Sequence, residues 1–337
     1  MLPPDHPPVP RPKIGVLLMN LGTPDAPDPK SVKRYLREFL SDRRVIEIPA
    51  LLWQPILRGI ILNTRPKKSA HAYSLVWRDD GSPLAAITRA QAVALKDAFG
   101  PGVMVDWAMR YGRPAIGDQV KAMKEAGCER ILLAPLYPQY CAATTATAHD
   151  KAFAELATMR WQPALRTLPP YYDDALYIDA LKTQLEAQLA TLDFEPEAIV
   201  ASFHGMPQRT LELGDPYHCH CRKTARLLAE AMKDTLNGRE LLVAFQSRFG
   251  RAKWLEPATD TVLESLPGRG IRKVAILAPG FSADCIETLE ELAIRGRESF
   301  EGAGGTHFAY LPCLNDSPTG IAMLRGLIER ELQGWLP

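Results

Sequence analysis

The stretch Ala198-Ile-Val-Ala-Ser-Phe-His204-Gly-Met-Pro207 is an apolar, β-branched run that ends in a histidine and is followed at once by a Gly-x-Pro break. Such a run is typical of a strand that is buried on both faces in a parallel sheet. In open α/β sheets, ligands bind at the carboxyl ends of the strands. His204 is therefore a candidate functional residue, although a loop histidine that only hydrogen-bonds the backbone fits the same position.

Apolar runs that alternate with amphipathic stretches extend this pattern along the whole chain. Strands are predicted at 14–20, 103–110, 130–136, 165–168, 198–203, 241–247, 273–279 and 307–311. Helices are predicted between most of them, at 87–99, 116–126, 177–190, 224–236, 259–266, 286–300 and 321–332. Strands that alternate with helices predict doubly wound parallel sheets of the α/β class.

Three short motifs recur in the same order in the two halves of the chain. The pairs are Leu21-Gly-Thr-Pro24 with His204-Gly-Met-Pro207, Arg110-Tyr-Gly-Arg113 with Arg248-Phe-Gly-Arg251, and Leu133-Ala-Pro135 with Leu277-Ala-Pro279. Such an internal repeat predicts two similar units of four strands each. Two units that face each other form a cleft, which is where large ligands bind.

The repeat also divides the chain into segments. We expect a first domain at 13–170, a second domain at 171–314 that carries the catalytic residues, and a helix within 315–337 that folds back on the first domain. Residues 1–12 are rich in proline and predict a disordered tail.

The first half is longer than the second by about 45 residues between matching glycines, which predicts an insertion within about 32–83. The insertion contains an apolar run at 49–62 and then Arg65, Lys67 and Lys68. It fits a surface helical hairpin packed on its own domain. It also fits an apolar lip over a cleft, or a patch that contacts a membrane.

The composition excludes several classes of protein. The 337 residues suit two domains, and 40 basic against 39 acidic residues leave no basic surface for a nucleic-acid partner. Six scattered cysteines are too few for a disulfide scaffold and predict a reducing cytoplasm. We find no apolar run long enough to span a bilayer, and neither a dinucleotide fingerprint nor a P-loop motif.

A row of carboxylates follows a second strand end, Leu277-Ala-Pro-Gly280. At 100° per residue, Asp284, Glu287 and Glu291 would lie within about 60° of one another on one helix face. Like charges at this spacing raise one pKa, which suits a proton relay or a site for a hard cation. The alternative is a capping box in which Asp284 caps the helix and Glu287 bonds back to it.

His204 and this carboxylate row are expected at the same edge of the second sheet. A neutral imidazole that faces carboxylates can accept a proton, and the two groups together can ligate Fe²⁺. The motif His218-Cys-His-Cys221 also resembles a metal site. It lacks a second ligand pair at zinc-site spacing, so a structural role is favoured.

Aromatic and basic residues gather near the ends of the predicted strands. They are Arg110, Tyr111, Tyr137, Tyr140 and Trp254. Together they suit a flat aromatic ligand that carries carboxylates, because rings stack on the ligand while a cation pairs with its acids.

Over about residues 13–332 the chain resembles the ferrochelatases, the lyases that insert ferrous iron into protoporphyrin IX to form protohaem, and it is most similar to their Gram-negative bacterial branch. The motifs that carry the resemblance are Leu18-Met-Asn-Leu-Gly-Thr-Pro-Asp25, Gly81-Ser-Pro-Leu84, Tyr137-Pro-Gln-Tyr140, Ser202-Phe-His-Gly-Met-Pro207, Gly214-Asp-Pro-Tyr217, Phe245-Gln-Ser-Arg248 and Asp284-Cys-Ile-Glu-Thr-Leu-Glu-Glu291.

The resemblance implies two Rossmann-like domains of the chelatase type, each a four-stranded parallel sheet flanked by helices, with the porphyrin in the cleft. It implies that His204 is the proton acceptor or metal ligand and that Glu287 is its partner across the porphyrin. We expect Asp284, which stands behind Glu287 in the carboxylate row, to be a further catalytic residue. Glu291 is a further candidate ligand for the substrate iron. Residues expected near the porphyrin are Met19, Arg65, Lys68, Tyr73, Ser82, Arg110, Tyr111, Tyr137 and Trp254.

Two departures from the family pattern matter. Animal members have a histidine at the position of Cys285, so any proton relay here works without that imidazole. After Cys313 the chain has no cysteine, so we expect no [2Fe–2S] cluster and no permanently bound cofactor, with Fe²⁺ only as substrate.

Three alternatives to this function stay open at the level of sequence. They are a chelatase for cobalt or nickel, a chelatase for coproporphyrin, and a non-catalytic carrier of porphyrin or haem. The expected location is the cytoplasm, with peripheral contact at the inner membrane through the lip as the alternative.

Overall fold

The computed structural model describes residues 13–250 and 252–336. The predicted tail at 1–12 and Arg251 of the second repeated motif lie outside the described residues. The strands form two sheets, in the orders β2-β1-β3-β4 and β6-β5-β7-β8, and all the paired strands run parallel. The predicted α/β class with two four-stranded parallel sheets is therefore confirmed.

The first half contains the first sheet and the insertion. Its elements are β1 (Lys13–Gly22), α1 (Pro29–Leu40), α2 (Ala50–Ile56), η1 (Leu57–Ile61), α3 (Leu62–Val76), α4 (Pro83–Phe99), β2 (Val103–Tyr111), α5 (Ile116–Glu125), β3 (Cys128–Pro135), η2 (Ala142–Ala146), α6 (Thr147–Leu156) and β4 (Ala164–Thr167).

The second half contains the second sheet and the last helix. Its elements are α7 (Ala175–Leu189), β5 (Ala198–His204), α8 (Gln208–Glu212), α9 (Tyr217–Ala231), α10 (Lys233–Leu236), β6 (Leu241–Gln246), α11 (Thr259–Ser265), η3 (Pro267–Arg269), β7 (Lys273–Leu277), η4 (Glu287–Gly296), α12 (Arg297–Gly302), β8 (His307–Leu311) and α13 (Pro318–Glu331).

One face of each sheet packs against helices of its own half, and the other face contributes to a core that the two halves share. Leu17 and Met19 of β1 pack under α5 and α6, while Val16 and Leu18 on the opposite face belong to a buried cluster that also contains Ile199 of β5. Alternate residues of a strand point to opposite faces, so a continuously apolar strand buries both. The inner faces of the two sheets therefore share one hydrophobic core with α4, α7, α9 and α13.

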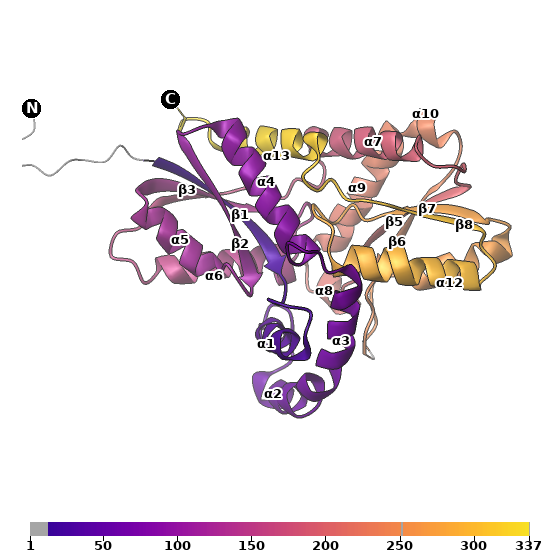
Figure 1. Ribbon diagram of the computed structural model, residues 1–337, viewed down its shortest axis with the longest axis horizontal. Coiled ribbons are helices and arrows are strands. Elements are labelled where there is room, and N and C mark those ends of the chain that lie inside the picture. The colour runs from indigo at the N-terminus through magenta and orange to yellow at the C-terminus, as the bar shows by residue number, and fades with distance from the viewer. Residues whose placement is uncertain (1–12, 251, 337) are drawn as a thin grey trace, which may run out of the picture.

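Helix α13 connects the two halves across the top of the molecule (Figure 1). It lies against α7 of the second half and α4 of the first. Beyond its end, Arg166 of β4 donates hydrogen bonds to the carbonyls of Glu331 and Gln333 and lies 4.3 Å from the ring centroid of Trp335. A cationic side chain at this place satisfies carbonyls that the helix leaves free.

The second strand of each half ends in the same backbone arrangement, but the residues at corresponding positions differ from those that the motifs suggested. After the second strand of each half, a backbone bond returns to that strand, from Met109 N to Pro114 O and from Phe245 N to Pro257 O. This alignment places Ser247, rather than Phe249, at the position of Tyr111. The predicted match of the Arg-aromatic-Gly-Arg motifs is thus wrong residue for residue, because Tyr111 ends β2 whereas Phe249 lies beyond β6.

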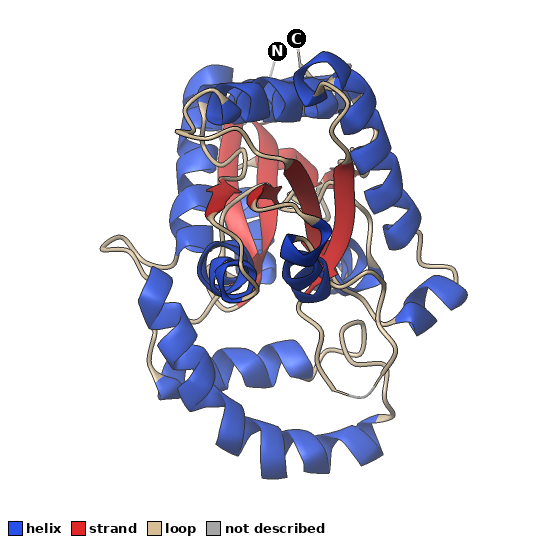
Figure 2. Cartoon of the chain, turned by 90° about the vertical axis from the view of Figure 1, so that its right-hand side faces the viewer, coloured by secondary structure: helices blue, strands red, loops and turns tan. Residues whose placement is uncertain are grey.

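The insertion is helical and extends away from both sheets (Figures 1 and 2). We refer to residues 29–76, which form α1, α2, η1 and α3, as the lip. Helix α1 begins where Asp28 accepts hydrogen bonds from two backbone N–H groups and Pro29 occupies the first turn. Val32, Ala70 and Tyr73 form a small cluster between α1 and α3, so the lip has apolar packing of its own. Within residues 13–250 and 252–336, we find no helix with the length and apolarity needed to cross a membrane.

Candidate functional site

His204 is the last residue of β5 and lies half-buried at the carboxyl edge of the second sheet. Its Nδ1 is 2.7 Å from the carbonyl oxygen of Gly205. A carbonyl can only accept a hydrogen bond, so Nδ1 carries the proton and Nε2 keeps its lone pair. The ring is thereby held in the tautomer in which Nε2 can accept a proton or ligate a metal.

Gly205 allows a second loop to approach this histidine closely. A Cβ at position 205 would lie 2.5 Å from Gln246 O and 3.3 Å from the indole of Trp254. The Trp254 Nε1 donates to Phe249 O at 3.0 Å, and the two rings lie 5.2 Å apart. The guanidinium of Arg65, from the lip, is 4.9 Å from the Phe249 ring centroid. The lip and the loop after β6 therefore meet beside His204.

The carboxylates lie in and before η4, which is a π-helix rather than the predicted α-helix. Its backbone bonds close wider turns, from residue i to residue i+5, and such segments are frequent at functional sites. Asp284 lies ahead of the first helical residue, Ile286. The expected single face of Asp284, Glu287 and Glu291 is therefore wrong, since it assumed 100° per residue from Asp284 onward.

The three carboxylates have different partners. Asp284, only 5% exposed, accepts hydrogen bonds from Thr288 Oγ1 at 2.9 Å, Tyr310 OH at 2.5 Å and Asn315 Nδ2 at 2.7 Å. Glu291 accepts from Ser247 N at 2.7 Å and from Ser247 Oγ at 2.5 Å. Among the described residues, no ion pair reaches the Glu287 carboxylate, and the side chain placed to donate to it is the thiol of Cys285. Asp284, which was expected to be catalytic, thus accepts hydrogen bonds on both carboxylate oxygens, whereas the Glu287 carboxylate is available to a ligand.

The alternative, a capping box between Asp284 and Glu287, does not form either. The backbone N–H of Cys285 donates to Thr288 Oγ1 at 2.9 Å, and that hydroxyl donates to Asp284. The Asp284 backbone N–H, which Glu287 would bind in a capping box, donates instead to Asn315 Oδ1 at 2.7 Å, so the Glu287 side chain is left for another role.

Groups that stay neutral surround Glu287. Burial, and after it the negative charge of Glu287, raises the pKa of the Tyr73 phenol and of the Cys285 thiol well above their ordinary values. Ile286 packs against Tyr73 and the rest of the α1–α3 cluster, so the lip forms the wall on this side. Glu287 thus lies half-buried beside uncharged side chains.

Gln246 joins the strand of His204 to the helix of Glu287. It is the register partner of His204 in β6, and its Oε1 accepts from Ser202 Oγ at 2.7 Å. Its Nε2 donates to the backbone carbonyl of Glu287 at 2.9 Å. The structure therefore brings His204 and Glu287 to the same edge of the second sheet, as expected from the sequence.

Arg110 and Tyr111 are engaged in a buried network at the base of the lip. Arg110 forms an ion pair with Asp42 and donates from Nε to Thr147 Oγ1 at 2.6 Å, and Tyr111 OH donates to Asp42 Oδ2 at 2.8 Å. Burial opposes ionisation of Asp42, but bonds from Thr147, Arg44 and Tyr111 and the charge of Arg110 hold its pKa below the usual value. Sequence reasoning missed Asp42, which lies 68 residues from Arg110 and in no motif.

The other residues expected near the porphyrin fall into three environments. Met19 and Tyr73 are buried, and Ser82 is the buried N-cap of α4, where its hydroxyl accepts from Ala85 N. The half-buried Tyr137 has a hydroxyl that is itself buried and has no hydrogen-bond partner within the described part of the chain. Arg65 and Lys68 are exposed on α3. The lip cations are thus accessible, whereas Arg110 is not.

The His218-Cys-His-Cys221 motif lies on α9. His220 stacks on Tyr172 with ring centroids 3.6 Å apart, its Nδ1 accepts from Tyr140 N at 3.2 Å, and Cys221 is buried. Within the described part of the chain we find no group of three or more histidine, cysteine or acidic side chains that could hold a resident metal ion. The geometry agrees with a structural role for this motif.

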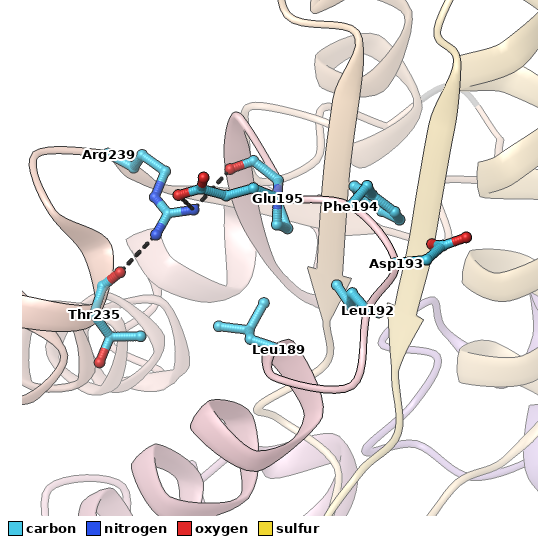
Figure 3. Close-up of a pocket in the computed structure, with 8 residues that line it drawn as sticks. Leu189, Leu192, Asp193, Phe194, Glu195, Thr235 and Arg239 are labelled. Carbon is cyan, nitrogen blue, oxygen red and sulfur yellow. Dashed lines mark hydrogen bonds and ion pairs between the residues drawn. The ribbon is translucent and has the colours of Figure 1, made fainter.

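A surface pocket of about 400 Å³ lies elsewhere, at the amino ends of β5 and β6 (Figure 3). Its lining residues are Leu189, Leu192, Asp193, Phe194, Glu195, Pro196, Thr235 and Arg239. Arg239 donates to the carbonyls of Leu236, Pro196 and Thr235, so its guanidinium holds the pocket wall together. Ligands in this architecture bind at the opposite edge of the sheet, where His204 lies.

The chain is similar to known proteins over nearly its whole length. The family model described as ferrochelatase matches residues 13–332. A ferrochelatase of Rhizobium meliloti (strain 1021) is 57% identical over 336 residues and covers 98% of each chain. A ferrochelatase of Allorhizobium ampelinum is 55% identical over 341 residues and covers 99% of this chain and 98% of its own. The solved structure of SirB from Bacillus subtilis with Fe3+ matches 96% of this chain and 98% of its own with a TM-score of 0.56 at 12% identity, which shows a shared fold.

Proposed function

The chain belongs to the ferrochelatase family, and from this premise we propose that His204 and Glu287 carry out its chemistry at the carboxyl edge of the second sheet. The protein inserts ferrous iron into protoporphyrin in haem synthesis. The observation that supports the two residues is that both lie at one edge of the sheet, where Nδ1 of His204 is bonded to Gly205 and the Glu287 carboxylate has no ion-pair partner among the described residues.

The reaction exchanges two protons for one metal ion. Free porphyrin carries two inner N–H groups, and Fe²⁺ replaces both protons to give protohaem and two released protons. His204 Nε2 and the Glu287 carboxylate can each accept a proton, and each can also ligate Fe²⁺. We assign proton acceptance and iron delivery to this pair, while Asp284 fixes the start of η4 through its bonds to Thr288, Tyr310 and Asn315.

The porphyrin is held by groups on both sides of the pair. The half-buried Tyr137 offers a ring surface, the buried Trp254 supports the site beside Gly205, and Arg65 and Lys68 are exposed cations that suit the propionates. Met19, Tyr73, Ser82 and Tyr111 shape the wall behind them, and Arg110 contributes through its network with Asp42. A site complementary to a bent ring uses binding energy to distort the porphyrin, which exposes the nitrogen lone pairs to the metal.

The test of the function is anaerobic insertion by the purified protein. Fe²⁺ with protoporphyrin should give the absorption spectrum of protohaem at many turnovers. Faster turnover with Co²⁺, or with coproporphyrin, would favour the chelatase alternatives. Stoichiometric binding without turnover would favour a carrier.

We also propose that the lip contacts a membrane surface peripherally, at the cytoplasmic face of the inner membrane. Leu51 and Leu52 are 91% and 65% exposed. Ile48, Ile56 and Ile60 are also exposed, and the exposed Arg58 lies among these apolar side chains. An apolar surface with cations at its rim suits the boundary of an anionic bilayer.

Vesicles of anionic phospholipid test this contact by co-sedimentation. A variant with Leu51→Asp and Leu52→Asp should lose binding, whereas the control Val93→Asp, at an exposed residue of α4, should bind as the unaltered protein does. Equal binding by all three proteins would contradict a role for the lip.

A further inference from the structure

We propose that Glu291 is a positioning residue that fixes the loop after β6 for porphyrin binding, and that it neither ligates the substrate iron nor relays protons. We refer to residues 247–254 as the β6 loop, of which 251 is not described. The inference rests on the proposed function, because this loop borders His204.

Ser247, the first residue of the loop, has an unusual backbone conformation. Its φ of 68° lies in the left-handed region, which residues other than glycine rarely adopt. Such a conformation persists only when neighbouring groups enforce it. Glu291 does so, because one carboxylate oxygen accepts from the backbone N–H and the other from the hydroxyl of the same serine.

These bonds occupy both oxygens of the Glu291 carboxylate. The Glu291 side chain is 20% exposed, and the guanidinium of Arg295 pairs with it at 3.8 Å between the guanidinium nitrogen and Oε2. To ligate a metal, Glu291 would have to release Ser247 and its backbone N–H. Charge-assisted bonds of this kind are the strong ones in proteins, so the geometry points to a structural anchor.

The far end of the β6 loop is attached next to His204. Leu255 N donates to Met206 O at 2.9 Å, and Gln208 N donates to Lys253 O at 2.8 Å. Between the two ends lie Phe249, which Arg65 of the lip covers, and Trp254, which packs on Gly205. Glu291 therefore controls one of the two attachments of the loop that presents these rings.

The first half secures the corresponding place in a similar way. Tyr111 occupies the position of Ser247 in the repeat, and its hydroxyl donates to the carboxylate of Asp42. In both halves an acidic side chain from another element holds the residue at this strand end. The repetition supports anchoring, since the Asp42 carboxylate is bonded to Arg110, Tyr111 and Thr147.

Steady-state kinetics of Glu291→Gln, Ser247→Ala and the double variant test the inference. Each single variant should raise the KM for protoporphyrin about tenfold, the effect of losing one strong hydrogen bond. The KM for Fe²⁺, kcat and the pH profile should change little. The double variant should be no worse than the worse single variant, because the two side chains act through one contact.

Further variants separate anchoring from unfolding. Ser247→Gly keeps the N–H bond and adopts the left-handed conformation freely, so its effect should be milder than that of Ser247→Ala. Glu298→Gln, at an exposed residue of α12, serves as the matched control and should behave as the unaltered enzyme. Melting curves should show all variants folded at the assay temperature.

Three results with Glu291→Gln would overturn the inference and favour a proton relay or an iron ligand. They are a lowered kcat with an unchanged KM for porphyrin, a raised KM for Fe²⁺, and a shifted pH profile. Porphyrin affinity measured by fluorescence quenching without iron gives an independent readout. It tests the anchor even if iron insertion itself fails, and equal affinity of Glu291→Gln and unaltered protein would contradict the anchor.

Discussion

His204 and Glu287 are distinguished from their neighbours by the groups to which they are bonded. The bond from Nδ1 to Gly205 leaves the second nitrogen of His204 open, and the Glu287 carboxylate faces only the weak thiol donor of Cys285 and no ion-pair partner among the described residues. Asp284 and Glu291, which looked equivalent to Glu287 in the sequence, are each saturated by neighbouring donors. Hydrogen bonding, rather than residue type, therefore distinguishes these carboxylates from one another.

Replacement of Glu287 separates its chemical role from a structural one. Glu287→Gln should lower kcat for iron insertion by about a hundredfold, the usual scale for losing a positioned acid or base. It should leave the melting temperature nearly unchanged, since no ion pair is lost and the neighbouring Cys285 thiol is only a weak donor. A large loss of stability with normal turnover of the folded fraction would contradict the assignment, and Glu298→Gln is the control.

The sequence singles out His204 as a candidate because a strand-end motif marks it, and Glu287 as a candidate because it lies in an acidic run. It could not identify Asp42 or Ser247. Their importance comes from contacts with Arg110 and Glu291, far away along the chain, and no local pattern encodes such contacts.

At the scale of elements, η4 and the lip define the surroundings of the site. The apolar positions of 286–300 correctly predicted a helix that packs against the second sheet. They did not show that it is a π-helix, because residues spaced for one buried face fit both kinds of helix over a few turns. The lip was located by comparing the two halves, while its helical structure and its contact with the β6 loop appeared only in the structure.

The base of the lip should show pH-dependent stability through Asp42. Its folded pKa is depressed, so the unfolded chain takes up a proton at higher pH than the folded chain does. The stabilisation is complete above the unfolded pKa of about 3.9 and is lost as the pH falls below it. Asp42→Asn should therefore lower the free energy of unfolding by about 2 kcal/mol at pH 7 and much less at pH 3.

Urea denaturation at the two pH values measures this difference. Asp97→Asn, at an exposed residue of α4, is the control and should have little effect at either pH. A deficit of the Asp42 variant that stays constant from pH 7 to pH 3 would show that the charge of Asp42 is not what stabilises the lip.

At the scale of the whole molecule, one core runs through both halves. Val16 of β1, Ile199 of β5 and Leu327 of α13 belong to the same buried cluster. The sequence predicted two similar sheets from the repeat. It could not predict how they pack, because strands buried on both faces do not reveal which layer covers each face.

The shared core should make the two halves unfold together. Calorimetry should record a single transition, with the calorimetric enthalpy close to the van't Hoff enthalpy. Two resolved transitions, one for each sheet, would contradict a continuous core.

The most direct test of the central assignment is haem formation by His204→Ala under anaerobic conditions, with His307→Ala, an exposed histidine of β8, as the control. Protoporphyrin fluorescence should still be quenched on binding to the His204 variant, while iron insertion falls to the background rate. A His204→Ala protein that forms haem at a rate comparable to that of the unaltered enzyme would contradict the role of this imidazole in the reaction.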